Sequence, residues 1–153
     1  MHLDEPDIEV ELTATTRAAH HRVSFPDGTA DAVVVVDLAR VIVEGVVDDA
    51  ALAAGRDDAE VKGHVHLENS LSPPGGYTVF FVLAADAAFT IDDALPLTGP
   101  EVRTALHFGP RDRSDPIQLK VGLSLVDLDG AQRNLDAEIP SFGHDDVTAE
   151  ARA

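Results

Sequence analysis

The chain has 153 residues, of which 44% are hydrophobic and 25% are charged, so its length and composition predict one globular domain with a single core. Twenty-eight acids against eleven Lys and Arg residues give a net charge of −17. A surface this negative repels nucleic-acid phosphates and anionic lipids, which excludes both as partners. The sequence contains no cysteine, which excludes disulfides, thiolate zinc sites and a cysteine nucleophile.

The N-terminal segment, residues 1–7, has neither a basic flank nor an apolar run, so no signal peptide is expected there. No stretch approaches the ~18 consecutive apolar residues of a membrane-spanning helix. We therefore expect no part of the sequence to cross a membrane as a helix.

Apolar residues at alternate positions, or in short continuous runs, predict seven or eight strands. The continuous run from Ala32 to Leu38 is typical of a strand covered on both faces, and Gly45 predicts a bulge or bend. The Ala-rich acidic segment from Asp48 to Asp58 predicts either a short helix or a surface loop. The predicted strands lie at 8–14, 21–25, 32–38, 41–47, 61–67, 77–83, 102–108 and 117–125.

The C-terminal region predicts one or two short helices. Asp129 is expected to cap the first, with Gln132 three residues later in capping-box position, and Pro140 ends it. Asp145 or Asp146 is expected to cap a second. Many short strands with almost no interior helix indicate an all-β protein, an antiparallel β-sandwich.

Two histidines are candidates for a functional site. His64 and His66 are two residues apart on a predicted strand, so their side chains share a face. They could supply two metal ligands, but a metal site needs a third ligand and supporting hydrogen bonds, so we assign no metal site. Alternatively, the two histidines lie at the protein surface, or they lie at an interface with another domain. By contrast, His20 and His21 are adjacent and should point to opposite faces.

An aromatic cluster is expected mainly to fill the core between the sheets, although Tyr77 is kept as a carbohydrate or interface candidate beside the two histidines. The chain has no Trp, the commonest platform for sugar stacking. The members of the cluster are Tyr77, Phe80, Phe81 and Phe89.

Acid pairs are frequent, as expected for twenty-eight acids. A glycosidase needs two carboxyl groups ~5–9.5 Å apart around the scissile bond, whereas adjacent acids in loops are usually solvated. Asp127-x-Asp129 matches an EF-hand only superficially, because the glycine and terminal glutamate of that loop are not at their positions. No catalytic residue is assigned. The pairs are Asp48–Asp49, Asp57–Asp58, Asp92–Asp93 and Asp145–Asp146.

Five segments, in this order and spacing, resemble glycoside hydrolase family 92, a family of calcium-dependent exo-acting α-mannosidases. The resemblance extends from about Ile8 to the C-terminus. One departure is Gly63-His64-Val65-His66-Leu67, where the family often places an aromatic residue and arginines after a glycine. The segments are EVELTAT at 9–15, RVSFP at 22–26, GYTVFFV at 76–82, KVGLS at 120–124 and AQRNLDAEIP at 131–140, followed by Phe142.

The resemblance implies a galactose mutarotase-like β-sandwich that precedes an (α/α)6 barrel, which in the family holds the catalytic carboxylates and the calcium site. The chain corresponds to the later part of that sandwich, and the family is typically secreted or periplasmic. Residues 1–140 are expected to form the sandwich, and residues 141–153 to begin the linker toward the barrel. No catalytic or calcium-binding residue is carried over, and no cofactor is expected in this chain.

The resulting hypothesis is a non-catalytic accessory sandwich of an α-mannosidase-like hydrolase, not an enzyme on its own. It would pack on the barrel, in cis or in trans, and shape the cleft for mannose-containing glycans. It also predicts an uncovered sheet edge and an exposed apolar patch near the last helix. The alternatives are a free-standing carbohydrate-binding or adhesion module and, less favoured, a small hydrolase that uses its own carboxylates.

Overall fold

The computed structural model describes residues 1–153 except 4–6, 42–43, 70–72, 93–95 and 152–153. In these residues the chain forms ten strands and two helices, and every strand pair is antiparallel. The prediction of an all-β sandwich with short C-terminal helices is confirmed. The strands are β1 (His2–Leu3), β2 (Ile8–Ala14), β3 (Ala18–Ser24), β4 (Val33–Asp37), β5 (Gly45–Ala54), β6 (Glu60–Asn69), β7 (Tyr77–Ala85), β8 (Thr90–Ile91), β9 (Arg103–His107) and β10 (Ile117–Ser124).

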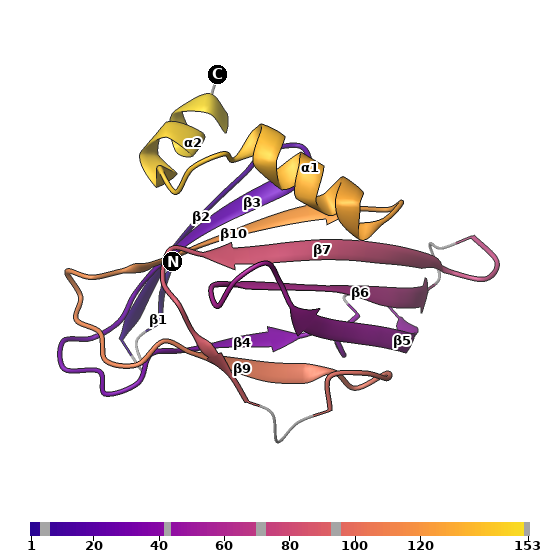
Figure 1. The fold of residues 1–153 in the computed structure, drawn as a ribbon, viewed down its shortest axis with the longest axis horizontal. Coiled ribbons are helices and arrows are strands. Elements are labelled where there is room, and N and C mark those ends of the chain that lie inside the picture. Colours follow the sequence, from indigo (N-terminus) through magenta and orange to yellow (C-terminus); the bar gives the residue numbers. More distant parts are fainter. Residues whose placement is uncertain (4–6, 42–43, 70–72, 93–95, 152–153) are drawn as a thin grey trace.

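The strands form three layers with the two helices, α1 (Leu128–Glu138) and α2 (His144–Ala151). Seven strands make a large sheet in the order β1-β2-β3-β10-β7-β6-β5, and three make a small sheet in the order β4-β9-β8. Figure 1 shows the helices on one side of the large sheet and β4 and β9 on the other. Consecutive strands pair at both ends of the large sheet, but its centre joins β3 to β10, far apart in sequence.

Two hydrophobic cores follow from this arrangement. The larger lies between the sheets and includes Phe81, Phe89 and Leu106, with Phe89 and Phe108 edge-to-face at 5.3 Å between ring centroids. The smaller lies between the large sheet and the helices and includes Val82, Leu135 and Ile139. Neither helix reaches the larger core, so the inter-sheet core is made by strands and their loops.

Strand β10 is the centre of the large sheet and is covered on both faces. Its sequence predicts one apolar face, and Ile117 and Leu119 are buried there. The opposite face is also covered, because α1 packs on it and buries Lys120 and Ser124. At Gly122 a Cβ atom would lie 2.5 Å from the carbonyl oxygen of Ala131 in α1, so glycine permits this close approach of helix to strand.

Several sequence predictions about the strands are corrected. The segment from Asp48 to Ala54 is part of strand β5, not a helix or a loop, because pairing with β6 outweighs the helical propensity of its alanines. The predicted irregularity near Gly45 lies slightly later, where the register shifts between Val47 and Asp49. The valine strand β4 is not covered on both faces, because Val35 is 64% exposed.

Two helix-cap predictions are also wrong. The cap of α1 is Asp127, not Asp129, which lies in the first turn of the helix. The second helix begins at His144, so neither Asp145 nor Asp146 precedes it as a cap. The C-terminal end of α1 is close to the prediction, since the helix ends at Glu138, two residues before Pro140.

Candidate domain interface

The connection between β10 and α1 is a tight turn held by hydrogen bonds within the segment itself. Ser124 Oγ accepts a hydrogen bond from the backbone N–H of Val126 at 3.1 Å, and Asp127 Oδ1 accepts one from the backbone N–H of Gly130 at 2.5 Å. The second bond satisfies a free N–H of the first helical turn. With the backbone fixed in this way, the side chains of Leu125 and Val126 are turned outward and are 71% and 77% exposed.

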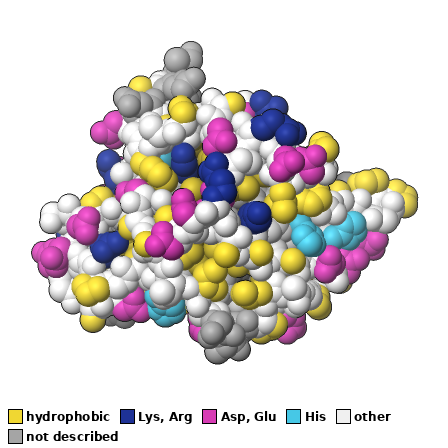
Figure 2. All heavy atoms as spheres, viewed as in Figure 1, with side chains coloured by type: hydrophobic (Ala, Val, Ile, Leu, Met, Phe, Trp, Pro, Cys, Tyr) yellow, Lys and Arg dark blue, Asp and Glu magenta, His cyan; other side chains and the backbone are white. Residues whose placement is uncertain are grey.

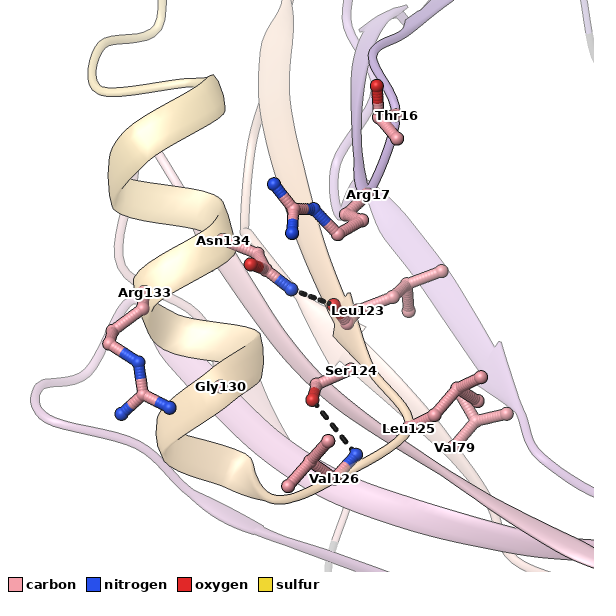
Figure 3. Close-up of a pocket in the computed structure, with 10 residues that line it drawn as sticks. All are labelled: Thr16, Arg17, Val79, Leu123, Ser124, Leu125, Val126, Gly130, Arg133 and Asn134. Atoms are coloured by element: carbon pink, nitrogen blue, oxygen red, sulfur yellow. Dashed lines mark hydrogen bonds between the residues drawn. The ribbon is translucent and has the colours of Figure 1, made fainter.

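Beside this turn is an open pocket of about 560 Å³, shown in Figure 3. Its apolar side chains come from β7, β10 and the turn, and its polar side chains come from α1 and from the turn before β3. Asn134 Nδ2 donates to the carbonyl oxygen of Leu123 at 2.7 Å. The pocket is lined by Thr16, Arg17, Val79, Leu123, Ser124, Leu125, Val126, Gly130, Arg133 and Asn134.

On the polar side of the pocket, Arg17 is bound to Glu138 of α1. Arg17 Nε donates to Glu138 Oε1 at 2.8 Å, and the Arg17 backbone N–H donates to Glu138 Oε2 at 2.8 Å. Thr15 Oγ1 donates to Oε2 at 2.6 Å. An apolar centre with a fixed polar rim is the usual anatomy of a protein interface.

The described residues that line this pocket lack the residue types of a glycosidase site. Among the described residues that line it there is no carboxylate and no histidine. A glycosidase needs a general acid and a second carboxylate at the scissile bond. The exposed apolar side chains of Leu125 and Val126 lie beside α1, whereas the apolar patch was predicted beside the last helix, α2.

The predicted pair His64 and His66 shares a face of β6, the face on the helix side of the large sheet. His64 Nε2 lies 3.0 Å from Asp49 Oδ2 on β5, and its ring is 6.0 Å from that of Phe80. His66 contacts Thr78 Oγ1 at 2.8 Å and the carbonyl oxygen of Gly75 at 3.1 Å. Both side chains are partly exposed.

Each of these histidines already has partners on neighbouring strands, which limits what they can bind. In the described parts of the chain, no group of three or more His, Asp or Glu side chains is placed to hold a metal ion. Their role as carbohydrate or interface residues stays a prediction.

The aromatic cluster divides between the layers. Phe81 and Phe89 are buried between the sheets as predicted, but Phe80 points to the opposite face and packs under the helices. Tyr77 is half-buried at the start of β7. The strand alternation explains the split, because Phe80 and Phe81 are consecutive.

The acid pairs lie at the surface where the structure describes them. Both members of Asp48–Asp49 and of Asp57–Asp58 are exposed. In the other two pairs, Asp93 and the side chain of Asp146 lie outside what the structure describes. Figure 2 shows the acidic side chains scattered over this face rather than gathered.

A second histidine cluster was missed by sequence reasoning. His20 and His21 do point to opposite faces, but His20 is fully buried on the helix side, and its ring centroid is 5.1 Å from that of His144 on α2. Desolvation is the main cause that lowers the pKa of His20 to about 4, with nearby cationic groups, His144 first among them, adding to it. No sequence signal joins these residues, because they are 124 positions apart.

The matches to known proteins agree with this fold. The sequence matches the family model of the glycosyl hydrolase family 92 N-terminal domain over residues 1–124. The chain belongs to this family. The family 92 match ends at the last residue of β10, so the exposed turn and both helices follow it directly. A search of curated proteins gives no match.

Solved structures with this fold come from much longer chains. A family GH92 α-mannosidase from Bacteroides thetaiotaomicron superposes with a TM-score of 0.81 and 16% identity, over 95% of this chain and 21% of that chain. A GH92 inverting mannosidase from Bacteroides thetaiotaomicron VPI-5482 superposes with a TM-score of 0.78 and 18% identity, over 96% of this chain and 20% of that chain. The GH92 glycosyl hydrolase ccman5 superposes with a TM-score of 0.76 and 24% identity, over 95% of this chain and 20% of that chain. This GH92 N-terminal domain thus spans about a fifth of each.

Proposed function

We propose that this chain is a non-catalytic accessory domain of an α-mannosidase-like glycoside hydrolase. It packs on a catalytic (α/α)6 barrel, supplied in cis or in trans, and forms one wall of the cleft that receives mannose-containing glycans. Residues 1–140 are the sandwich, and residues 141–153 lead toward the barrel. The observation that carries the proposal is the exposed pair Leu125 and Val126 in the turn that follows the family 92 match.

Three features of the turn support a role in docking. Its backbone is fixed by Ser124 and Asp127, so the apolar pair is presented without the entropy cost of ordering a loop on binding. It adjoins a pocket with an apolar side and a polar rim. It is also next to the helices that lead onward from the sandwich. A protein that exposes large apolar side chains on a rigid turn commonly buries them in an interface.

Calcium, in this proposal, is a ligand of the barrel rather than of this chain. The described residues offer no set of three or more His, Asp or Glu ligands, whereas Ca²⁺ takes six to eight oxygen ligands. The hydrolytic carboxylates are likewise placed in the barrel, because the pocket beside α1 has no acid among its described lining residues.

The test uses this chain together with the barrel of a family 92 mannosidase produced from a separate reading frame. Association is measured by analytical ultracentrifugation, and hydrolysis of an aryl α-mannoside is measured with calcium present. We expect a complex, and activity that requires it. Replacing both Leu125 and Val126 with Ser should weaken association at least tenfold. The matched control replaces two exposed apolar residues elsewhere, Leu12 and Val46, with Ser and should leave association with the barrel unchanged.

Two outcomes would contradict the proposal. Equal effects of the two double variants would remove the turn from the interface. Mannoside hydrolysis by this chain alone would make it an enzyme in its own right. Binding of mannose-containing glycans by the isolated chain, lost in Tyr77→Ala or in His64→Ala with His66→Ala, would instead favour a free-standing carbohydrate-binding module.

A further inference from the structure

The contact between α2 and the large sheet is built around histidines that lack hydrogen-bond partners. Both ring nitrogens of His20 and the Nε2 atom of His144 are buried without one. His20 is fully buried and His144 is 7% exposed. A buried polar group without a partner destabilises the folded state, and a charged one does so much more strongly. A positive charge on His20, whose two ring nitrogens both lack a partner, therefore strongly disfavours the buried state.

The surroundings of His20 also oppose a positive charge. Lys120 on β10 lies directly opposite His20 in the sheet, and its ammonium group donates to the carbonyl oxygen of Ile139 at 3.1 Å and sits 4.8 Å from the ring of Phe142. The ring of Phe142 is 6.3 Å from that of His20. His144 faces His20 from α2, so a proton on His20 is disfavoured both by His144 and by the ammonium group of Lys120.

Among the described side chains, the remaining charged groups pair mainly with one another, and Asp145 also approaches the ring of His144. Arg22, also on β3, is bound by Glu11 of β2 at 2.5 Å, and the exposed Asp145 of α2 lies 3.6 Å from Arg22 and 3.8 Å from His144 Nδ1. Both acids thus interact with Arg22. His21 points to the other face of β3, and Asp136 of α1 acts on Lys120 rather than on the rings.

We propose that His20 and His144 form an acid-released latch that holds α2 and the segment before it on the large sheet at neutral pH. Protonation of His20 detaches residues 140–151 from β2 and β3, while the sandwich stays folded. Apart from the histidines, the attachment depends on few buried apolar residues, chiefly Val147 with the partly buried Phe142. Loss of the contacts around His20 and His144 is therefore enough to detach residues 140–151 from the sheet.

The sign of the effect follows from the depressed pKa of His20. A free histidine ionises near 6.5, whereas His20 does so at about 4. The closed state is therefore favoured fully above pH 6.5 and loses its advantage as the pH falls from 6.5 toward 4. By linkage, the ratio of closed to open molecules should fall by about thirtyfold between pH 7.5 and pH 5.0 for this one group.

The test places a spin label at each of two exposed positions, Ala53→Cys on β5 and Ala149→Cys on α2. Because the natural chain has no cysteine, the spin label reacts only at these two introduced cysteines. Pulsed electron paramagnetic resonance should give one narrow distance at pH 7.5 and a broad, longer distribution at pH 5.0. Working at pH 5.0 keeps the chain above its isoelectric point of about 4.4.

Replacing His20 with Phe removes the titrating group and fills the same apolar site, so the distance should stay narrow at both pH values. The matched control, His64→Gln on β6, should open like the natural chain. If His20→Phe does not fold, the proton titration of the His20 ring in the natural chain provides the test. An unchanged distance at pH 5.0, identical opening in His20→Phe, or a His20 ring that titrates at 6.5 or above would each overturn the latch.

Discussion

Arg17 and Glu138, 121 residues apart, join the last turn of α1 to the turn between β2 and β3. Glu138 accepts hydrogen bonds from both the backbone N–H and the guanidinium of Arg17, each at 2.8 Å, and from Thr15 Oγ1 at 2.6 Å. An acid at the C-terminal end of a helix is unfavourable for the helix dipole. Its position is explained by these three donors, which fix α1 across the sheet.

Replacing Glu138 with Ala should lower the free energy of unfolding by about 1.5–3 kcal/mol, the range for hydrogen bonds to a charged group. Arg17→Ala should cost less than about 1 kcal/mol, because its guanidinium is 60% exposed and its backbone N–H is retained. Urea denaturation at pH 7 measures both. Equal losses would mean that the ion pair, rather than the backbone and hydroxyl donors, stabilises this contact.

The pH dependence of the same contact has a definite sign. Burial raises the pKa of Glu138, but hydrogen bonds from Thr15 and Arg17 outweigh it and hold that pKa below its usual value. The contact therefore stabilises the fold above pH 4.5 and is lost as the pH falls through the lowered pKa. Below pH 4.5, the stability of Glu138→Gln should fall less steeply with pH than that of the natural chain, as measured by thermal unfolding.

The cap of α1 provides a paired comparison between two nearby acids. Asp127→Ala should lower the free energy of unfolding by about 0.5–2 kcal/mol, because the N–H of Gly130 loses its acceptor. Asp129→Ala should cost under about 1 kcal/mol, since that acid only complements the helix dipole. Chemical denaturation of the two variants decides between them. A larger loss for Asp129→Ala would restore the cap that the sequence pattern predicts.

Gly122 is the point of closest approach between α1 and β10. An added methyl group would meet the carbonyl oxygen of Ala131 at 2.5 Å and Leu135 Cβ at 2.6 Å. We expect Gly122→Ala to lower the free energy of unfolding by about 1–3 kcal/mol, as overpacking does elsewhere. Thermal unfolding followed by circular dichroism measures this. An unchanged or raised melting temperature would show that α1 can move away from the sheet at no cost.

Strand β4 lies at an exposed edge of the small sheet, because among the described strands it pairs only with β9. An open apolar groove of about 500 Å³ lies between its valines and the large sheet. Exposed valine edges favour edge-to-edge association. Val35→Lys should therefore raise the concentration at which the chain associates, with a change in unfolding free energy within about 0.5 kcal/mol. Light scattering at high salt, where the net charge is screened, measures this association. Equal scattering by Val35→Lys and the natural chain would show that this edge does not promote association.

The amino-acid sequence by itself determined most of the longer strands, their alternation, the all-β class and the family, because each depends on residues close together in the chain. His64 and His66 share a face for the same reason. The sequence did not predict the two-residue strands β1 and β8, which pair with β2 and β9. The exceptions are local patterns that tertiary contacts override. The alanines of β5 form a strand because β6 pairs with them, and the turn after β10 makes Asp127 rather than Asp129 the cap.

Only the tertiary structure decided which residues meet across the layers. The burial of Lys120 and the approach of α1 to Gly122 depend on a helix that follows β10 and folds back over it. The pairing of His20 with His144 depends on α2 crossing strands from the other end of the chain. Such contacts are set by long-range packing, and no spacing in the sequence encodes them.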